Sequence, residues 1–403
     1  MLNNKTNTII LYFSSLISVV VGVGTSVLNT HSLSVADYGD VRYINNFMNF
    51  FSSIFLFGFF VSGSRLLAIT TNSIKRRKIN GAMIIMLSIA SLSSVISLFL
   101  CSLGHNSQHL CSLFLYSLPV SFAPLLLNYV NNTFQGENRI INLSIARCLP
   151  SILYLFIAFV IYKYVHVTSV LMILLQNGIL ILVLVSCIIY TKPLFAGLKD
   201  VFKELFVENK RYGIHVYLGS VFAVGFSYLA GIFLGIFNSD NTDVGFYTLA
   251  LTISNPLMIL PSIVGTSYFK EFATSRTIKK KLLLVTAGFS FLSLILYIVL
   301  IYPVVIFLYD ESYIPVAKIA IFLAFASVLH GLGDTFNRFL GAHGAGKCLR
   351  NGAFITGGIL LIGNVMFIYL WGINGAILTR ILSSLAYLLS MVYYYKKLNN
   401  NNL

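Results

Sequence analysis

Residues 75–103 have the sequence KRRKINGAMIIMLSIASLSSVISLFLCSL, in which four basic side chains precede a long uncharged segment. A helix needs about 20 consecutive apolar residues to cross a hydrocarbon core about 30 Å thick. Residues 79–103 meet this requirement without a single charged side chain. Clusters of Lys and Arg mark the cytoplasmic ends of such helices. The segment therefore predicts a transmembrane helix that starts on the cytoplasmic side.

The rest of the chain repeats this pattern of apolar segments and short charged gaps. Of the 403 residues, 57% are hydrophobic and only 10% are charged, and the mean hydropathy is +0.86. Soluble domains carry roughly 25% charged residues, so the composition predicts an all-α membrane protein. The start of the chain lacks the pattern of a cleavable signal peptide, and its first apolar segment is counted as a span. The twelve predicted spans are 8–30, 41–70, 79–103, 110–134, 140–162, 168–190, 212–237, 244–270, 281–308, 315–341, 350–370 and 372–395.

The basic residues are concentrated in every second gap between the predicted spans. Twenty of the 27 Lys and Arg residues lie in these gaps or at the ends of the chain, whereas the other gaps hold only Arg42, Lys163 and Lys318. The positive-inside rule places the first set, and hence both termini, in the cytoplasm. Because topology explains most of the net charge of +15, we expect no nucleic-acid partner.

The predicted spans fall into two halves with six spans each. We expect an N-terminal six-helix bundle at 1–190 and a C-terminal six-helix bundle at 212–403 that ends in a short cytoplasmic tail. Between them, 191–211 alternates charged and apolar residues, which predicts a cytoplasmic amphipathic linker at the membrane surface. An even number of spans gives both halves the same orientation.

Once the charges assigned to the gaps and the chain ends are set aside, five charged side chains remain inside the predicted spans: Arg65, Arg147, Asp334, Arg338 and Arg380. An arginine at the centre of a span costs about 2.5–3.5 kcal/mol, so such residues face a partner or a water-filled cavity. Arg65, Arg147 and Arg338 lie near cytoplasmic ends, where snorkelling to the headgroups is an equal alternative. Arg380 lies farther from either end, and we expect it to face an aqueous cavity or to pair with Asp334.

His330, Asp334 and Arg338 recur every four residues and therefore share one face of a helix. One interpretation is a satisfied polar seam in which Asp334 neutralises Arg338. The other is a cavity wall at which His330 and Asp334 exchange protons and so couple transport to an ion.

Guanidinium groups bind phosphate oxygens through two parallel hydrogen bonds. Arg65, Arg147, Arg338 and Arg380 are therefore predicted to bind the phosphate of an anionic substrate. Polar side chains in the spans, such as Asn45, Asn49, Asn128 and Tyr129, suit hydroxyl-rich sugars. The five cysteines show no CxxC motif and no metal-type spacing, so we predict neither a metal site nor a cofactor.

Four short motifs are spread in order along nearly the whole chain. They are LSVADYGD at 33–40, GFYTLA at 245–250, LGAHGAGK at 340–347 and WGINGA at 371–376. Together they resemble the polysaccharide transporters of the MATE-like (MOP) superfamily, which include the Wzx-type O-antigen flippases. Twelve spans rather than fourteen argue against the branch that carries peptidoglycan precursors.

The resemblance implies two six-helix bundles around a central cavity in the bacterial inner membrane. It implies alternating access that moves an undecaprenyl-pyrophosphate-linked oligosaccharide, such as an O-antigen repeat unit, from the cytoplasmic to the periplasmic leaflet. It implies no enzymatic activity. The expected partners are this lipid-linked substrate, membrane lipids, a glycan polymerase and a chain-length regulator.

Two other functions compete with this one. A cation-coupled multidrug exporter of the same superfamily would need carboxylates in its spans, and Asp334 is the only one. A membrane-embedded O-antigen polymerase or ligase would carry a sizeable outward-facing loop with catalytic Arg or His, whereas the outward gaps here are short.

Overall fold

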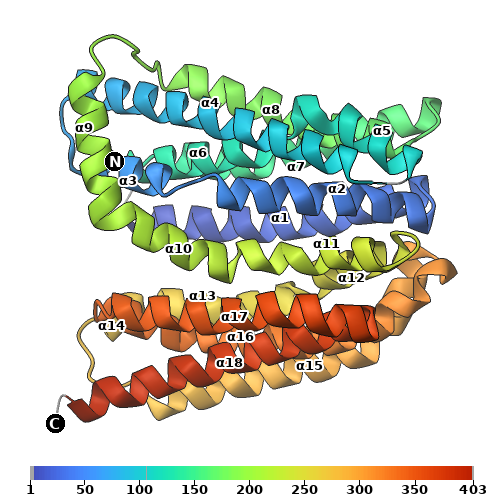
Figure 1. Ribbon diagram of the computed structural model, residues 1–403. Helices are drawn as coiled ribbons and strands as arrows, with labels where there is room; N and C mark the ends of the chain where they lie inside the picture. Colours follow the sequence, from blue (N-terminus) through green and yellow to red (C-terminus); the bar gives the residue numbers. More distant parts are fainter. Residues whose placement is uncertain (1–3, 106, 402–403) are drawn as a thin grey trace. The chain divides into compact units, whose positions relative to one another are not determined.

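The computed structural model describes residues 4–105 and 107–401 (Figure 1). Helices and the turns between them make up these described residues, with no β-strand among them. The chain divides into two compact units, Met1–Leu218 (unit 1) and Gly219–Leu403 (unit 2). The division falls inside a helix of the seventh predicted span.

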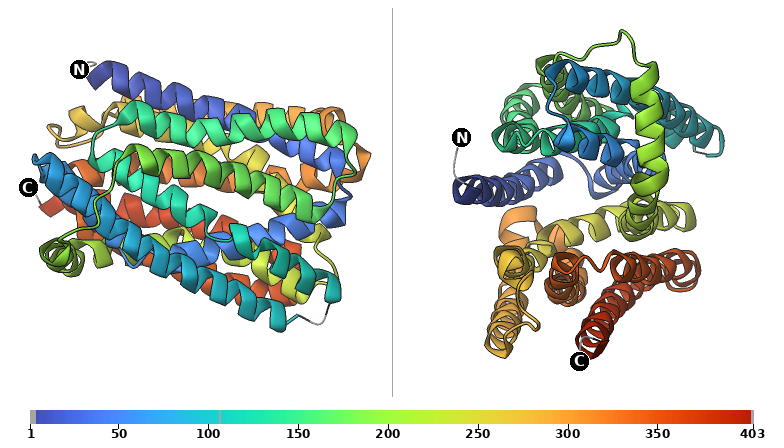
Figure 2. Two further views of the ribbon diagram at one scale, coloured as in Figure 1. Left: turned by 90° about the horizontal axis from the view of Figure 1, so that it is seen from above. Right: turned by 90° about the vertical axis from the view of Figure 1, so that its left-hand side faces the viewer.

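Unit 1 is built from nine helices and the beginning of a tenth. They are α1 (Asn4–Ser32), α2 (Val35–Ile54), α3 (Phe59–Ile69), α4 (Ser73–Leu103), α5 (Gln108–Ser117), α6 (Ala123–Gly136), α7 (Ile140–Tyr164), α8 (Ser169–Tyr190), α9 (Lys199–Glu208) and the start of α10 (Ile214–Ala223). A short π-helix, η2 (Asn209–Gly213), joins α9 to α10. Helix α1 packs along α7 (Figure 2).

Unit 2 contains the end of α10 and eight further helices. They are α11 (Leu229–Phe237), α12 (Thr242–Ser254), α13 (Pro256–Ser267), α14 (Phe269–Phe272), α15 (Lys280–Tyr309), α16 (Ile314–Ala342), α17 (Gly346–Trp371) and α18 (Ile373–Asn401). Helix α16 packs against α12, α13, α15 and α18. The candidate span that contains it is 61% buried, which makes α16 the central helix of this unit.

Ten helical segments of the described chain are long and apolar enough to cross a membrane, or eleven if one bent pair forms a single span. We predicted twelve. The first predicted span, 8–30, begins in a segment whose side chains lie outside the described residues. The second, 41–70, is not a straight helix, because α2 and α3 meet at an angle of 58°.

The bend between α2 and α3 is held by the π-helix η2. Gly58 has a φ of +79°, a conformation that favours glycine, and a Cβ at this position would lie 2.6 Å from the Gly213 carbonyl oxygen. The Asn209 amide donates a hydrogen bond to the Phe57 carbonyl at 3.0 Å and accepts one from Ser62 Oγ at 3.1 Å. The Phe57 carbonyl at the bend thus has a hydrogen-bond donor from a distant segment, as a buried backbone group requires.

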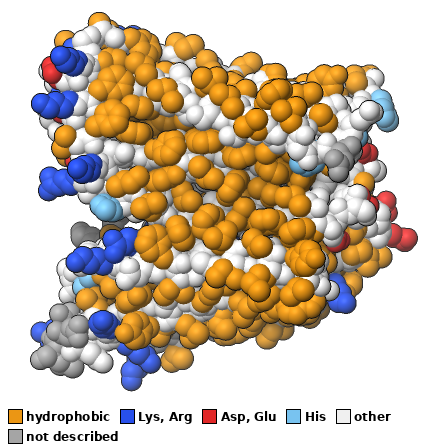
Figure 3. All heavy atoms as spheres, in the orientation of Figure 1, with side chains coloured by type: hydrophobic (Ala, Val, Ile, Leu, Met, Phe, Trp, Pro, Cys, Tyr) orange, Lys and Arg blue, Asp and Glu red, His pale blue; other side chains and the backbone are white. Residues whose placement is uncertain are grey.

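Hydrophobic side chains are exposed along the helices of both units. On the face shown in Figure 3, they cover the middle of the helices, and the basic side chains of unit 1 gather at one end of its helices. In α15, Leu284, Phe289 and Phe307 are 73%, 65% and 86% exposed. Apolar patches of this extent mark a membrane-facing surface. The protein is therefore an all-helical, multi-pass integral membrane protein.

Candidate functional site

Arg65 is paired within unit 1. Its Nη1 atom lies 2.7 Å from Oε1 of Glu208, and its guanidinium lies 4.9 Å from the centre of the Tyr212 ring. The Arg65 side chain is 44% exposed, so the guanidinium remains accessible. Sequence reasoning missed Glu208, which is 143 residues away and which we had assigned only to the linker.

Arg147, also in unit 1, is exposed on α7, and its Nε atom donates a hydrogen bond to Asn131 Oδ1 of α6 at 2.9 Å. Asn131 belongs to a series of half-buried asparagines, which we call the amide face. Its members are Asn45, Asn46 and Asn49 on α2 and Asn128, Asn131 and Asn132 on α6. A hydrogen bond of 3.2 Å from Asn128 to Ser52 Oγ joins the two helices.

The amide face presents mainly hydrogen-bond acceptors. The side-chain NH₂ groups of Asn46, Asn49 and Asn132 donate to backbone carbonyls four residues earlier, at 2.9, 2.7 and 2.8 Å. Among the described residues, no donor approaches the Oδ1 atoms of these three amides. Unpaired acceptors within membrane-spanning helices are costly against lipid. This face is therefore suited to hydroxyl donors or water.

Asp334 of unit 2 has two side-chain partners. Its Oδ2 atom accepts a hydrogen bond from Ser262 of α13 at 2.5 Å and lies 3.3 Å from Nε of Arg338, one turn along α16. This ion pair is the one named in the polar-seam interpretation of their spacing. Within the described part of the chain, no ion pair joins Asp334 to Arg380. These contacts favour the polar seam over a proton-exchanging wall.

His330 lies one turn before Asp334 on α16. Its ring stacks on the Tyr387 ring of α18, with the centroids 4.3 Å apart and the planes inclined by 15°. The His330 ring therefore contacts α18, whereas Asp334 contacts α13. His330 and Asp334 lie on the same face of α16, but they contact two different neighbouring helices.

Arg380 on α18 is the least satisfied of the four predicted arginines. Its Nε atom is buried and has no hydrogen-bond partner among the described residues. Its charge interacts with His330 on α16 and with Tyr247 on α12. A buried N–H group without an acceptor costs about 1–3 kcal/mol. Of the four predicted arginines, Arg380 is therefore the one whose contacts most clearly leave room for an anion.

Asp37, Asp40 and His109 form a group of possible metal ligands that the sequence did not predict. Their ligand atoms lie within 4.8 Å of one another in unit 1. Two internal contacts already occupy these side chains: His109 Nε2 lies 2.9 Å from Asp40 Oδ2, and Ser34 donates to Asp37 at 2.6 Å. The His109–Asp40 contact joins residues 69 positions apart, which spacing rules cannot detect.

The comparison with protein families matches residues 5–270 to the family described as polysaccharide biosynthesis protein. A search of curated protein sequences finds no match. A solved structure of the lipid II flippase MurJ, in an inward closed conformation, has a TM-score of 0.76 at 18% identity, over 96% of this chain and 87% of that chain.

Two multidrug transporters have the same fold. An inward-facing transporter of the multidrug resistance MATE family, from the MOP superfamily, gives a TM-score of 0.68 at 16% identity, over 97% of this chain and 96% of that chain. The MATE multidrug transporter DinF-BH gives a TM-score of 0.67 at 13% identity, over 99% of this chain and 96% of that chain. At such identities the likeness establishes the fold and not the substrate.

The family match spans well over half of the chain, and the fold likeness spans nearly all of it. Both agree with the resemblance inferred from the motifs at 33–40, 245–250, 340–347 and 371–376, which is thereby confirmed. The fold is MATE-like, as predicted, and it is also similar to that of MurJ, which was not predicted. The chain belongs to the polysaccharide biosynthesis protein family, and its fold is that of the MATE and MurJ structures.

Proposed function

We propose that this protein is a flippase for a lipid-linked oligosaccharide in polysaccharide biosynthesis. The substrate is a polyprenyl-pyrophosphate-linked repeat unit, such as an O-antigen unit, which moves from the cytoplasmic to the periplasmic leaflet of the bacterial inner membrane. The transport is non-enzymatic, proceeds by alternating access, and leaves both termini in the cytoplasm. A glycan polymerase and a chain-length regulator would receive the product.

The observation that carries this proposal is the buried Nε atom of Arg380, which has no hydrogen-bond partner among the described residues. A buried guanidinium N–H without an acceptor gains most from an anionic ligand, because a charge-assisted hydrogen bond is roughly twice as strong as a neutral one. Pyrophosphate offers several such oxygens. Arg65, Arg147 and Arg338 already have a protein partner each, and we assign them supporting contacts with the phosphates.

The amide face supports the glycan part of the substrate. Sugar hydroxyls are hydrogen-bond donors, and the Oδ1 atoms of Asn46, Asn49 and Asn132 are acceptors without donors among the described residues. The membrane potential would assist export, because moving negative charge out of a negative cytoplasm gains about 2.3 kcal/mol per charge per 100 mV.

The proposal is tested in a strain that lacks the gene and is complemented with variants. We expect Arg380→Ala to abolish surface glycan and to cause lipid-linked repeat units to accumulate inside the cell. Lys318→Ala is the matched control, because it removes an exposed basic charge from the same unit. Normal surface glycan with Arg380→Ala, at wild-type protein levels, would contradict the assignment.

A further inference from the structure

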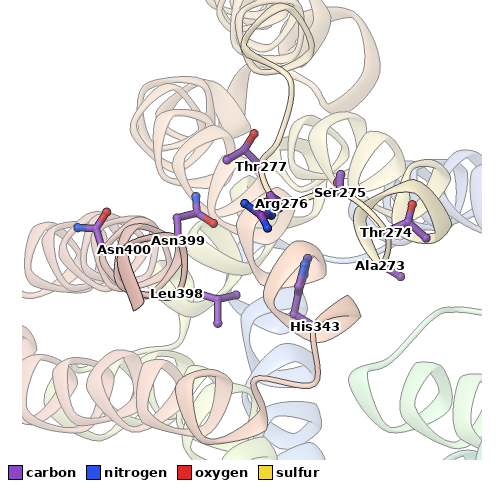
Figure 4. Close-up of a pocket in the computed structure, with 9 residues that line it drawn as sticks. All are labelled: Ala273, Thr274, Ser275, Arg276, Thr277, His343, Leu398, Asn399 and Asn400. Atoms are coloured by element: carbon purple, nitrogen blue, oxygen red, sulfur yellow. The ribbon is translucent and has the colours of Figure 1, made fainter. Parts of the chain in front are cut away.

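A cavity of about 510 Å³ lies at one end of unit 2, apart from the arginines discussed above. It is bordered by the loop 273–277, by His343 after α16, and by Leu398, Asn399 and Asn400 near the end of α18 (Figure 4). We propose that this cavity binds a phosphate ester, in the form of an anionic phospholipid headgroup or of a soluble phosphate compound.

Arg276 supplies the permanent positive charge of the cavity. Its guanidinium lies near the middle of the lining residues in Figure 4, and no hydrogen bond or ion pair joins it to another described residue. The acidic residue just before this loop, Glu271 of α14, is already paired with Lys279 at 2.7 Å. The hydrogen bond to Glu271 raises the pKa of Lys279, so this lysine stays protonated. The five N–H donors of Arg276 are thus left for an external anion.

His343 approaches the same space from the opposite side of the cavity, and its ring points toward Arg276 (Figure 4). Its Nδ1 atom lies 3.0 Å from the Phe339 carbonyl oxygen, and its ring packs on the Phe339 ring at 4.3 Å. Because a carbonyl oxygen only accepts, Nδ1 must carry a proton. The ring is therefore held in place through Nδ1, and Nε2 is the ring nitrogen left for a ligand.

Two uncharged side chains beside Arg276 can also donate hydrogen bonds to phosphate oxygens. Thr277 and Asn399 lie beside Arg276 in Figure 4, and among the described residues neither side chain has a hydrogen-bond partner. They come from elements more than a hundred residues apart in the sequence. One guanidinium, one imidazole, a hydroxyl and an amide thus converge on a single cavity.

The position of the cavity at the helix ends favours a lipid as the source of the phosphate. Helix α15 begins at Lys280, next to the cavity loop, and exposes Leu284 and Val285 by 73% and 53% within about one turn of Lys281. An acyl chain can follow this apolar surface while the headgroup occupies the cavity beside Arg276. Basic pockets at the ends of membrane helices bind anionic headgroups in this way.

The test measures lipid binding to the purified full-length protein by native mass spectrometry, after delipidation. The probes are phosphatidylglycerol, phosphatidylcholine and inorganic phosphate, each added separately. The variant is Arg276→Gln, and the matched control is Lys280→Gln, which removes a neighbouring exposed charge outside the cavity. Both variants should elute as the same monodisperse species as the wild type.

We expect the wild type to retain phosphatidylglycerol in preference to phosphatidylcholine. Loss of one charge-assisted contact should weaken this binding at least about tenfold in Arg276→Gln and leave it unchanged in Lys280→Gln. Binding of inorganic phosphate that depends on Arg276 would support the site with a soluble ligand. Equal weakening by both variants, or no preference among the probes, would overturn the proposal. Because Arg276 is not one of the transport arginines, this result is independent of the flippase assignment.

Discussion

Nη1 of Arg65 lies 2.7 Å from Oε1 of Glu208, and this ion pair joins α3 to the last residue of α9. The same guanidinium lies over the Tyr212 ring of η2, at 4.9 Å. A residue predicted to bind phosphate therefore already has an anionic neighbour. A substrate phosphate would have to share Arg65 with Glu208 or displace it.

The first prediction separates these two roles of Arg65. We expect Arg65→Ala to lower surface glycan and Glu208→Ala to leave it near wild type, because only Arg65 attracts an anion. Each variant should lose only about 0.2–1 kcal/mol of stability, because the Arg65 side chain is 44% exposed. Complementation assays and melting temperatures of the purified variants measure the two effects. Equal loss of glycan in both variants would mean that the ion pair itself matters.

The second prediction concerns the shape of the Arg380 side chain. Arg380→Lys keeps the positive charge but replaces the planar guanidinium by a point charge, which cannot form two parallel hydrogen bonds with a phosphate. We expect the rate of glycan appearance after induction to fall about tenfold or more. Lys318→Arg, a change of the same type at an exposed position, should leave the rate unchanged. A wild-type rate for Arg380→Lys would show that charge alone suffices.

The third prediction tests Asp334 as a structural counter-charge. In Asp334→Asn, Arg338 loses its carboxylate, and we expect the protein to lose about 0.2–1 kcal/mol of stability, because the Arg338 side chain is 43% exposed, while it still exports glycan. The double variant Asp334→Asn/Arg338→Gln should recover part of that stability, because the unpaired charge is gone. Thermal denaturation and export with and without a proton gradient are the measurements. Export that no longer depends on the proton gradient in Asp334→Asn would contradict this prediction and would show that Asp334 carries the coupling proton.

The fourth prediction uses two adjacent glycines on α17. A Cβ on Gly357 would lie 2.5 Å from the Phe222 carbonyl oxygen of α10, whereas one on Gly358 would have no atom within 4 Å. We expect Gly357→Ala to cost about 1–3 kcal/mol by overpacking. Gly358→Ala should be neutral or stabilising by up to about 1 kcal/mol, because alanine favours helix more than glycine does. Similar melting temperatures for both variants would contradict this close approach of α10 and α17.

Sequence patterns predicted well those features that depend on neighbouring residues. The pairing of Asp334 with Arg338 follows from their spacing on one helix, and most predicted spans coincide with apolar helices of the described chain. The predictions failed where a distant segment intervenes. The second predicted span bends because Gly58 adopts a positive φ and Asn209 of η2 caps the Phe57 carbonyl. No property of 41–70 alone reveals that contact.

The sequence by itself determined that the chain spans a membrane, most of the segments that do so, and which few charges remain among them, because hydropathy and charge are local properties. Only the tertiary structure decided the partners that lie far away in the sequence. Arg65 binds Glu208 from 143 residues away, Asp334 accepts from Ser262 across 72 residues, and the buried Nε of Arg380 has no acceptor among the described residues. The physical reason is that the packing of helices distant in sequence selects which polar groups come within hydrogen-bond distance.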